Sequence, residues 1–191
     1  MKSKIYSSRY MKVSSKGMMW IPAFVTIGFL LAFPVAELIM LGNWFGMGYT
    51  TSEINALYAN LWQDGFMLTG LAVAATAALF NGISQFWYLY SPRKIDFYHS
   101  LPVKRSRRFW HKTLQSLLYY LFPYLAMEFF SVCIGAMRGF FSLHLMKLAF
   151  LMMVFHLLLY LLLYFSVVFV ICITGHLLMG ALLLIAVAAY G

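Results

Sequence analysis

Charged residues are scarce in this chain. Asp, Glu, Lys and Arg make up 10% of its 191 residues, whereas soluble domains carry about 25%. Acidic side chains are the scarcest, with five against fourteen Lys and Arg and a net charge of +9. Hydrophobic residues reach 63% and the mean hydropathy is +0.82. This composition excludes an ordinary soluble domain and predicts an integral membrane protein. A nucleic-acid partner is excluded too, because no soluble domain exists to present a basic face.

Cysteine and catalytic motifs are also lacking. Cys133 and Cys172 both fall inside apolar runs, without the spacing of a metal or redox site, and are interpreted as small packing residues. The chain contains no GxSxG, no HExxH and no phosphate-binding GxxxxGK[ST]. The sequence therefore predicts no catalytic residues, no metal site and no cofactor in this chain.

Long apolar runs dominate instead, and about 20 helical residues cross a membrane core of about 30 Å. The predicted fold is all-α, a polytopic bundle of membrane helices. It comprises a basic arm over 1–17 and a transmembrane domain over 18–191, with spans at about 18–41, 65–90, 113–137, 148–173 and 177–191. The last run rises only about 21 Å up to Tyr190. We therefore expect four full spans and a truncated fifth, continued beyond the given sequence.

The basic residues predict the orientation. Five lie in the N-terminal arm and seven in the 91–112 loop, against none after the first span and two after the third, Arg138 and Lys147. Because Lys and Arg accumulate in cytoplasmic loops, the N-terminus and the 91–112 loop are expected in the cytoplasm. A bacterial cell membrane is the expected location.

The connection over 42–64 contains an amphipathic stretch, "TSEINALYANLW", with Ser52 as a possible N-cap. It predicts a short helix lying in the membrane interface, with an ordinary ordered loop as the alternative.

Within the spans, small residues recur every fourth position at Gly70, Ala74, Ala78 and Gly82. This stripe lets another helix approach closely, within one chain or between two.

Two ionisable residues, Glu128 and His156, fall in the outer half of their spans, and Glu37 lies near the outer end of the first span. Such groups should face protein or a water-filled cavity. One interpretation is a cavity that meets a polar or cationic substrate. The alternative is a protonated or hydrogen-bonded Glu128, a neutral His156 bonded across a helix interface, and a Glu37 that reaches the interface.

The 91–112 loop carries more order than orientation requires. Pro92 and Pro102 bound a segment whose apolar residues are spaced for one or two helical turns. We expect a short helix there, then a basic re-entry near Ser106. An exposed aromatic patch on such a helix is typical of a docking surface.

The stretch "DFYHSLPVKRSRRFWHK" resembles the cytoplasmic loop of ABC transporter permeases of the ABC type 2 class. The basic arm and the tight turn Thr174–His176 agree with this resemblance. The chain departs from the six spans usual in that family by ending inside the fifth. The resemblance implies an ATP-driven exporter subunit without its own ATP site, in which ATP and Mg²⁺ bind a separate ABC ATPase, and which pairs with a second permease.

The resemblance also implies roles for individual loop residues. The ATPase would contact Phe97, Tyr98, His99, Ser100 and Leu101. Lipid headgroups would hold Arg105, Arg107 and Arg108. Two other functions stay open: an intramembrane enzyme that uses Glu128 and His156, and a non-catalytic assembly or immunity protein that only packs against others.

Overall fold

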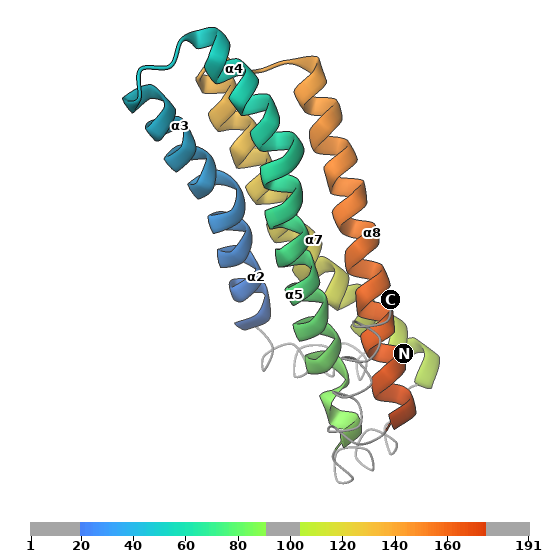
Figure 1. The fold of residues 1–191 in the computed structure, drawn as a ribbon. Coiled ribbons are helices and arrows are strands. Elements are labelled where there is room, and N and C mark those ends of the chain that lie inside the picture. Colours follow the sequence, from blue (N-terminus) through green and yellow to red (C-terminus); the bar gives the residue numbers. More distant parts are fainter. Residues whose placement is uncertain (1–19, 91–103, 175–191) are drawn as a thin grey trace, which may run out of the picture. The chain divides into compact units, whose positions relative to one another are not determined.

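The computed structural model describes residues 20–90 and 104–174, and these residues are almost entirely helical, with no strand among them (Figure 1). The first helical segment comprises α2 (Trp20–Leu30), η1 (Leu31–Val35) and α3 (Ala36–Gly46). The second comprises α4 (Thr51–Asn60), η2 (Leu61–Gly65), α5 (Phe66–Phe86) and η3 (Trp87–Tyr90). Two long helices follow, α7 (Arg105–Met137) and α8 (Leu143–Thr174).

Each of these four segments is long and apolar enough to cross a membrane. Their surfaces are apolar, with large side chains such as Phe122, Phe150 and Phe169 exposed, while Glu37 and Asn81 are buried. This distribution reverses that of a soluble domain and fits a lipid environment. The prediction of an all-helical, multi-pass membrane protein is confirmed at this level. The basic arm, the 95–101 helix and the fifth run lie outside the described residues.

The prediction for the 42–64 connection is confirmed only in part. The helix expected over this stretch is observed as α4, but it does not stand apart from the second span, because Thr51 to Tyr90 is one continuous helical segment. Its N-cap is Thr50 rather than Ser52: the Glu53 carboxylate accepts from the Thr50 N–H at 2.8 Å. Gly65 does not end the helix, because the five-residue π-helix η2 carries the chain through it. The connection to α3 is therefore only 47–50.

The boundary of the 91–112 loop also changes. Residues 105–112 are the first two turns of α7, so the loop ends about eight residues earlier than the apolar pattern indicated. Hydrophobicity marks where a helix enters lipid and not where its hydrogen bonding starts, and the basic residues of this stretch are good helix formers. The start expected near Ser106 is one residue from the observed start.

The described chain forms two compact units. Unit 1 contains 78–118 and 161–174 together with Trp20 and Ile21, and unit 2 contains 22–77 and 119–160. In unit 1, the buried Lys112 donates from Nζ to the Gln85 carbonyl at 2.5 Å and lies 3.9 Å from the Tyr88 ring centroid. These contacts join the end of α5 to the start of α7.

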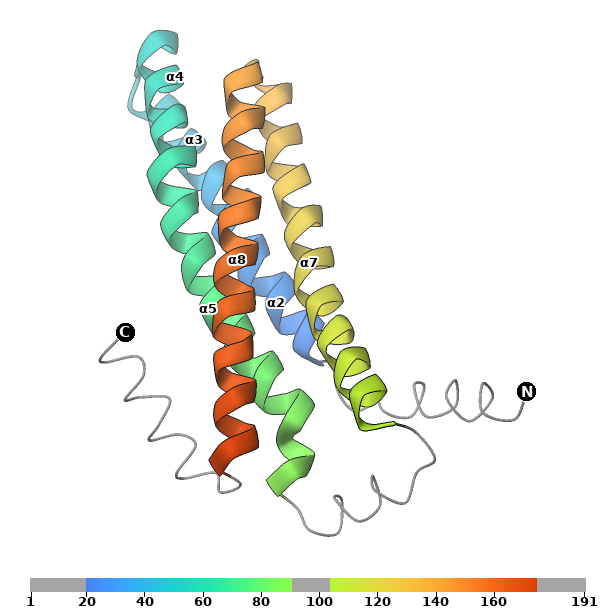
Figure 2. The ribbon, with the colours of Figure 1, turned by 90° about the vertical axis from the view of Figure 1, so that its right-hand side faces the viewer.

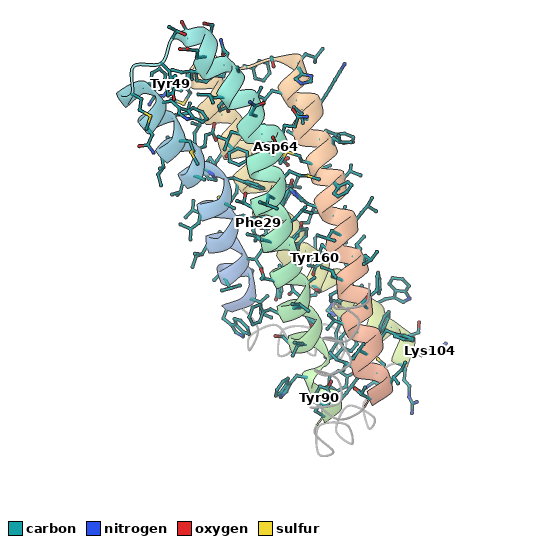
Figure 3. The ribbon with its side chains drawn as sticks, in the orientation of Figure 1. Phe29, Tyr49, Asp64, Tyr90, Lys104 and Tyr160 are labelled. Atoms are coloured by element: carbon teal, nitrogen blue, oxygen red, sulfur yellow. The ribbon has the colours of Figure 1, made fainter. Side chains whose placement is uncertain are left out.

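Unit 2 is packed around aromatic rings. Tyr120 of α7 stacks on Tyr160 of α8 with centroids 4.0 Å apart, and Phe29 of α2 meets Tyr124 edge-on at 5.1 Å. Phe29 and Tyr160 are labelled in Figure 3. The second half of α7 and the first half of α8 run side by side, joined through a short turn over 138–142 (Figure 2). Gly139 has φ +82° in this turn, a conformation that favours glycine.

Candidate functional site

A buried hydrogen bond joins the first two helical segments inside unit 2. Glu37 of α3 is 0% exposed, and the Tyr58 hydroxyl of α4 donates to its Oε1 at 2.6 Å. The Ser131 hydroxyl of α7 lies beside the same carboxyl. Gly135, one turn along α7, makes room for Tyr58, because a Cβ there would overlap the phenol oxygen. Glu37 thus sits in a polar cluster and is enclosed by protein.

A second cluster links the two ionisable residues that the sequence singled out. The Tyr124 hydroxyl lies 3.3 Å from Glu128 Oε1 and 3.1 Å from His156 Nδ1. His156 Nε2 lies 3.0 Å from the Met67 carbonyl of α5. His156 is 0% exposed and Glu128 is 9% exposed. Gly70 leaves the space that the imidazole occupies, since a Cβ there would overlap the ring.

The two clusters share one face of α7. Tyr124, Glu128, Ser131 and Gly135 follow one another at spacings of four, three and four residues, which places them on a single helical stripe. Glu128 and Ser131 are separated by about 4.5 Å of helix rise. The stripe therefore brings both buried carboxyls to neighbouring turns.

Donors and acceptors in the second cluster determine one another. The Met67 carbonyl only accepts, so His156 Nε2 carries a hydrogen. When Tyr124 donates to a Glu128 carboxylate, its oxygen accepts from Nδ1–H and His156 is an imidazolium. In the other form, the Nδ1 proton has moved to Tyr124 and the Tyr124 proton has moved to Glu128. The protonated Glu128 then donates to Tyr124, and Tyr124 donates to Nδ1 of a neutral ring. The arrangement can therefore shift protons between Glu128 and His156 through one hydroxyl.

The neutral form is the one expected in lipid. Removing a charged group from water into the protein interior costs about several kcal/mol per ion. Among the described residues, no Lys or Arg is an interaction partner of Glu37 or Glu128. A charged Glu128 is therefore expected only together with the His156 imidazolium or another cation that compensates it.

The remaining predicted site residues do not belong to these two clusters. The stripe from Gly70 to Gly82 is buried, with Gly70 against His156 in unit 2 and Gly82 against Val167 in unit 1, so α8 approaches it in both units. Arg105 and Arg107 are exposed and free to face headgroups, whereas Arg108 is only 9% exposed and interacts within the protein. Residues 97–101 lie outside the described residues.

Sequence reasoning missed the parts that Tyr58 and Tyr124 play in these clusters. The four-residue spacing from Tyr124 to Glu128 was a usable signal, whereas the pairing of Tyr58 with Glu37 spans 21 positions and two helices. No group of three His, Cys, Asp or Glu able to hold a metal occurs in the described part of the chain.

Comparisons with known proteins return nothing for this chain: no family model, no curated protein and no solved structure matches it.

Proposed function

We propose that this chain is the membrane-spanning permease subunit of an ATP-driven exporter, moved by a separate ABC ATPase through the 91–112 segment. The observation that supports this function best is the pair of hydrogen-bonded clusters around Glu37 and Glu128, enclosed in helices of membrane-spanning length. Ionisable groups are costly at such depth and usually serve a transport path or relay. The chain holds no phosphate-binding motif, so ATP would act through a partner.

The proposal also draws on the resemblance of Asp96–Lys112 to the cytoplasmic loop of ABC type 2 permeases. ATP binding would close the ATPase subunits, move this segment and shift α7, whose first turns carry Arg105 and Arg107. Because α7 also carries Glu128, a movement of this helix reaches the buried cluster directly. A second permease chain would complete the transporter.

The experiment coexpresses the tagged chain with a candidate ATPase, chosen from neighbouring reading frames by its phosphate-binding loop, and purifies the tagged chain in detergent. The double variant Tyr98→Ala, Leu101→Ala should lose the complex and its ATP turnover, because it removes the apolar docking contacts. The control variant Lys104→Ala changes an exposed residue of the same segment, outside the predicted contact residues 97–101, and should keep both. A double variant that retains the complex with unchanged ATP turnover would refute the coupling role.

One observation favours an intramembrane enzyme as the second candidate. Glu128 and His156 are connected through Tyr124, and a proton can pass between them. The crevice beside Glu128 is too narrow for a water molecule, which weighs against hydrolysis in this conformation. Loss of a chemical activity in both Glu128→Gln and His156→Ala, with the ATPase complex intact, would favour the enzyme.

A further inference from the structure

The cluster of Glu128, Tyr124 and His156 connects three helices through polar contacts. His156 of α8 contacts the Tyr124 hydroxyl of α7 through Nδ1, at 3.1 Å, and the Met67 carbonyl of α5 through Nε2, at 3.0 Å. Tyr124 also contacts Glu128 Oε1, at 3.3 Å. The imidazole therefore joins α8 to α7 and to α5 at once.

One proton shared between Glu128 and His156 makes every one of these contacts a hydrogen bond. The protonated Glu128 donates to Tyr124, and Tyr124 donates to Nδ1. The Nε2–H donates to the Met67 carbonyl. The pair carries no net charge in this form, which suits its burial.

Removing the shared proton leaves too few hydrogens. The Tyr124 O–H and one imidazole N–H then have to serve three contacts. The Glu128 carboxylate takes the Tyr124 hydrogen, because charge-assisted hydrogen bonds are roughly twice as strong as neutral ones. An imidazole hydrogen on Nε2 keeps Met67 and loses Tyr124, whereas one on Nδ1 keeps Tyr124 and loses Met67. In either tautomer, α8 loses its hydrogen bond to one neighbouring helix.

The ionised Glu128 is also unstable in its present surroundings. It lines a crevice, here called the Glu128 crevice, together with Phe33, Trp62, Phe66 and Met152. This crevice is too narrow for a water molecule. A buried carboxylate that meets neither water nor a cation is strongly disfavoured. Loss of the proton therefore favours a conformation in which the crevice is wider and water reaches the carboxylate.

Burial indicates where the proton leaves. His156 is 0% exposed and Tyr124 is 1% exposed, whereas Glu128 is 9% exposed. The imidazole is enclosed by Gly70, where a Cβ would overlap the ring, and by Phe33, whose ring centroid is 6.4 Å away. Glu128 is thus the exit for the proton, and His156 exchanges protons through Tyr124.

The other groups packed near the cluster do not replace its proton. Tyr120 of α7 and Tyr160 of α8 stack beside it with centroids 4.0 Å apart, and phenols ordinarily ionise only near pH 10. From α5 and η1, the cluster meets the Met67 carbonyl and the Phe33 ring, which do not titrate. The other buried carboxyl, Glu37, hydrogen-bonds to α4. Among the described residues, proton loss therefore depends on Glu128 and His156.

We propose that one proton, shared by Glu128 and His156 through Tyr124, keeps the Glu128 crevice closed, and that its release opens the crevice. The carboxyl of Glu128 gives the proton to a water molecule that enters the opening crevice, and α8 separates from α7 or from α5. Its regulatory role in transport rests on the proposed function, because an ATPase that moves α7 would also control the proton. The proton-dependent closure itself requires no ATPase.

The first test measures distances between helices in the purified full chain, without an ATPase. With Cys133 and Cys172 changed to Ser, spin labels on Phe122→Cys and Leu158→Cys occupy exposed positions of α7 and α8. A second pair, Leu68→Cys with Leu158→Cys, reports on α5 and α8. The pH is raised from about 5 to about 9, past the range in which exposed Glu and His lose their protons. At least one pair should show a longer distance at the higher pH.

Two variants assign the response to Glu128. Glu128→Gln keeps the side-chain size, has no proton to lose and can still donate to Tyr124, so its distances should stay short at both pH values. The matched control Glu37→Gln changes the other buried carboxyl and should keep the response, because Glu37 bonds to α4. Circular dichroism checks that both variants remain helical. Distances that do not change with pH in the chain with native carboxyls, or a response that persists in Glu128→Gln, overturn the proposal.

The second test compares proton loss with opening in the same chain. The infrared C=O band of protonated Glu128, assigned by its absence in Glu128→Gln, should vanish over the pH range in which the distance grows. Within this range the ratio of open to closed chain should rise about tenfold per pH unit, as release of one proton requires. A band that persists in the open state, or that vanishes at constant distance, refutes the coupling of the proton to closure.

The two proposals fail separately. A chain whose distances ignore pH but which keeps its ATPase complex retains the exporter and rejects the proton-dependent closure. A chain that opens with pH but binds no ATPase retains the closure and rejects the coupling role of the 91–112 segment.

Discussion

Adding one methyl group at Gly135 should uncouple Glu37 from the rest of unit 2. The new Cβ of Gly135→Ala would overlap the Tyr58 hydroxyl, and the ring carbon Cζ would lie 3.0 Å away. Tyr58 therefore has to move, and its hydrogen bond to Glu37, 2.6 Å long, is lost or stretched. Overpacking in a close-packed interior costs about 1–3 kcal/mol. A hydrogen bond between membrane helices adds about 0.6–1.7 kcal/mol, so we expect a loss of about 2–4 kcal/mol.

A double-mutant cycle isolates the clash. Tyr58→Phe removes the hydroxyl and should cost about 1 kcal/mol, because only the hydrogen bond is lost. In that background Gly135→Ala should cost about 2 kcal/mol less than in the unmodified chain, because the ring without its oxygen only has to shift slightly. Gly42→Ala is the matched control, since nothing lies within 4 Å of a Cβ at this helical position.

The assay is equilibrium unfolding of the purified chain in mixed micelles, followed by circular dichroism and tryptophan fluorescence. Gly42→Ala should leave stability unchanged or raise it by up to about 1 kcal/mol, because Ala favours the helix over Gly and nothing blocks its methyl group. Equal costs of Gly135→Ala with and without the Tyr58 hydroxyl would show that the phenol does not pack on Gly135, and the described geometry of the Glu37 cluster would be wrong.

Two further outcomes follow from the buried carboxyls and the α4 cap. Infrared difference spectra should contain a C=O band of a protonated carboxyl that disappears in Glu37→Gln and another that disappears in Glu128→Gln, because unpaired buried carboxylates neutralise. The control Glu53→Gln changes an exposed carboxylate and should remove no such band. A spectrum without these bands would contradict the neutral form. Thr50→Ala should lower stability by about 1 kcal/mol as a lost N-cap, and Ser52→Ala by less than about 0.5 kcal/mol; the reverse order in chemical unfolding would return the cap to Ser52.

The spans could be predicted from the sequence because lipid imposes a simple rule on composition. A helix in the membrane satisfies its own backbone, so a run of about 20 apolar residues indicates one without knowledge of its neighbours. The same rule did not show that the 42–64 connection joins the second span as one helix, because Gln63 and Asp64 interrupt the apolar pattern. The helix there begins at a capped N-terminus and continues through a π-turn. Both are features of hydrogen bonding, which hydropathy does not report.

The candidate site was predictable only in part. Glu128 and His156 stood out because ionisable residues are rare within apolar runs. Their connection through Tyr124 depends on how α7 and α8 are rotated toward each other, and aromatic residues are too common in this chain to single one out.

The sequence by itself determined that this chain is a multi-pass, all-helical membrane protein, because length and apolarity act locally along each run. Only the tertiary structure decided which polar groups meet. Gly135 admits the Tyr58 hydroxyl and Gly70 admits the His156 ring, so two glycines with no chemistry of their own set the positions of both clusters. Burial and hydrogen-bond partners are properties of packing between distant segments, and no single stretch of sequence contains them.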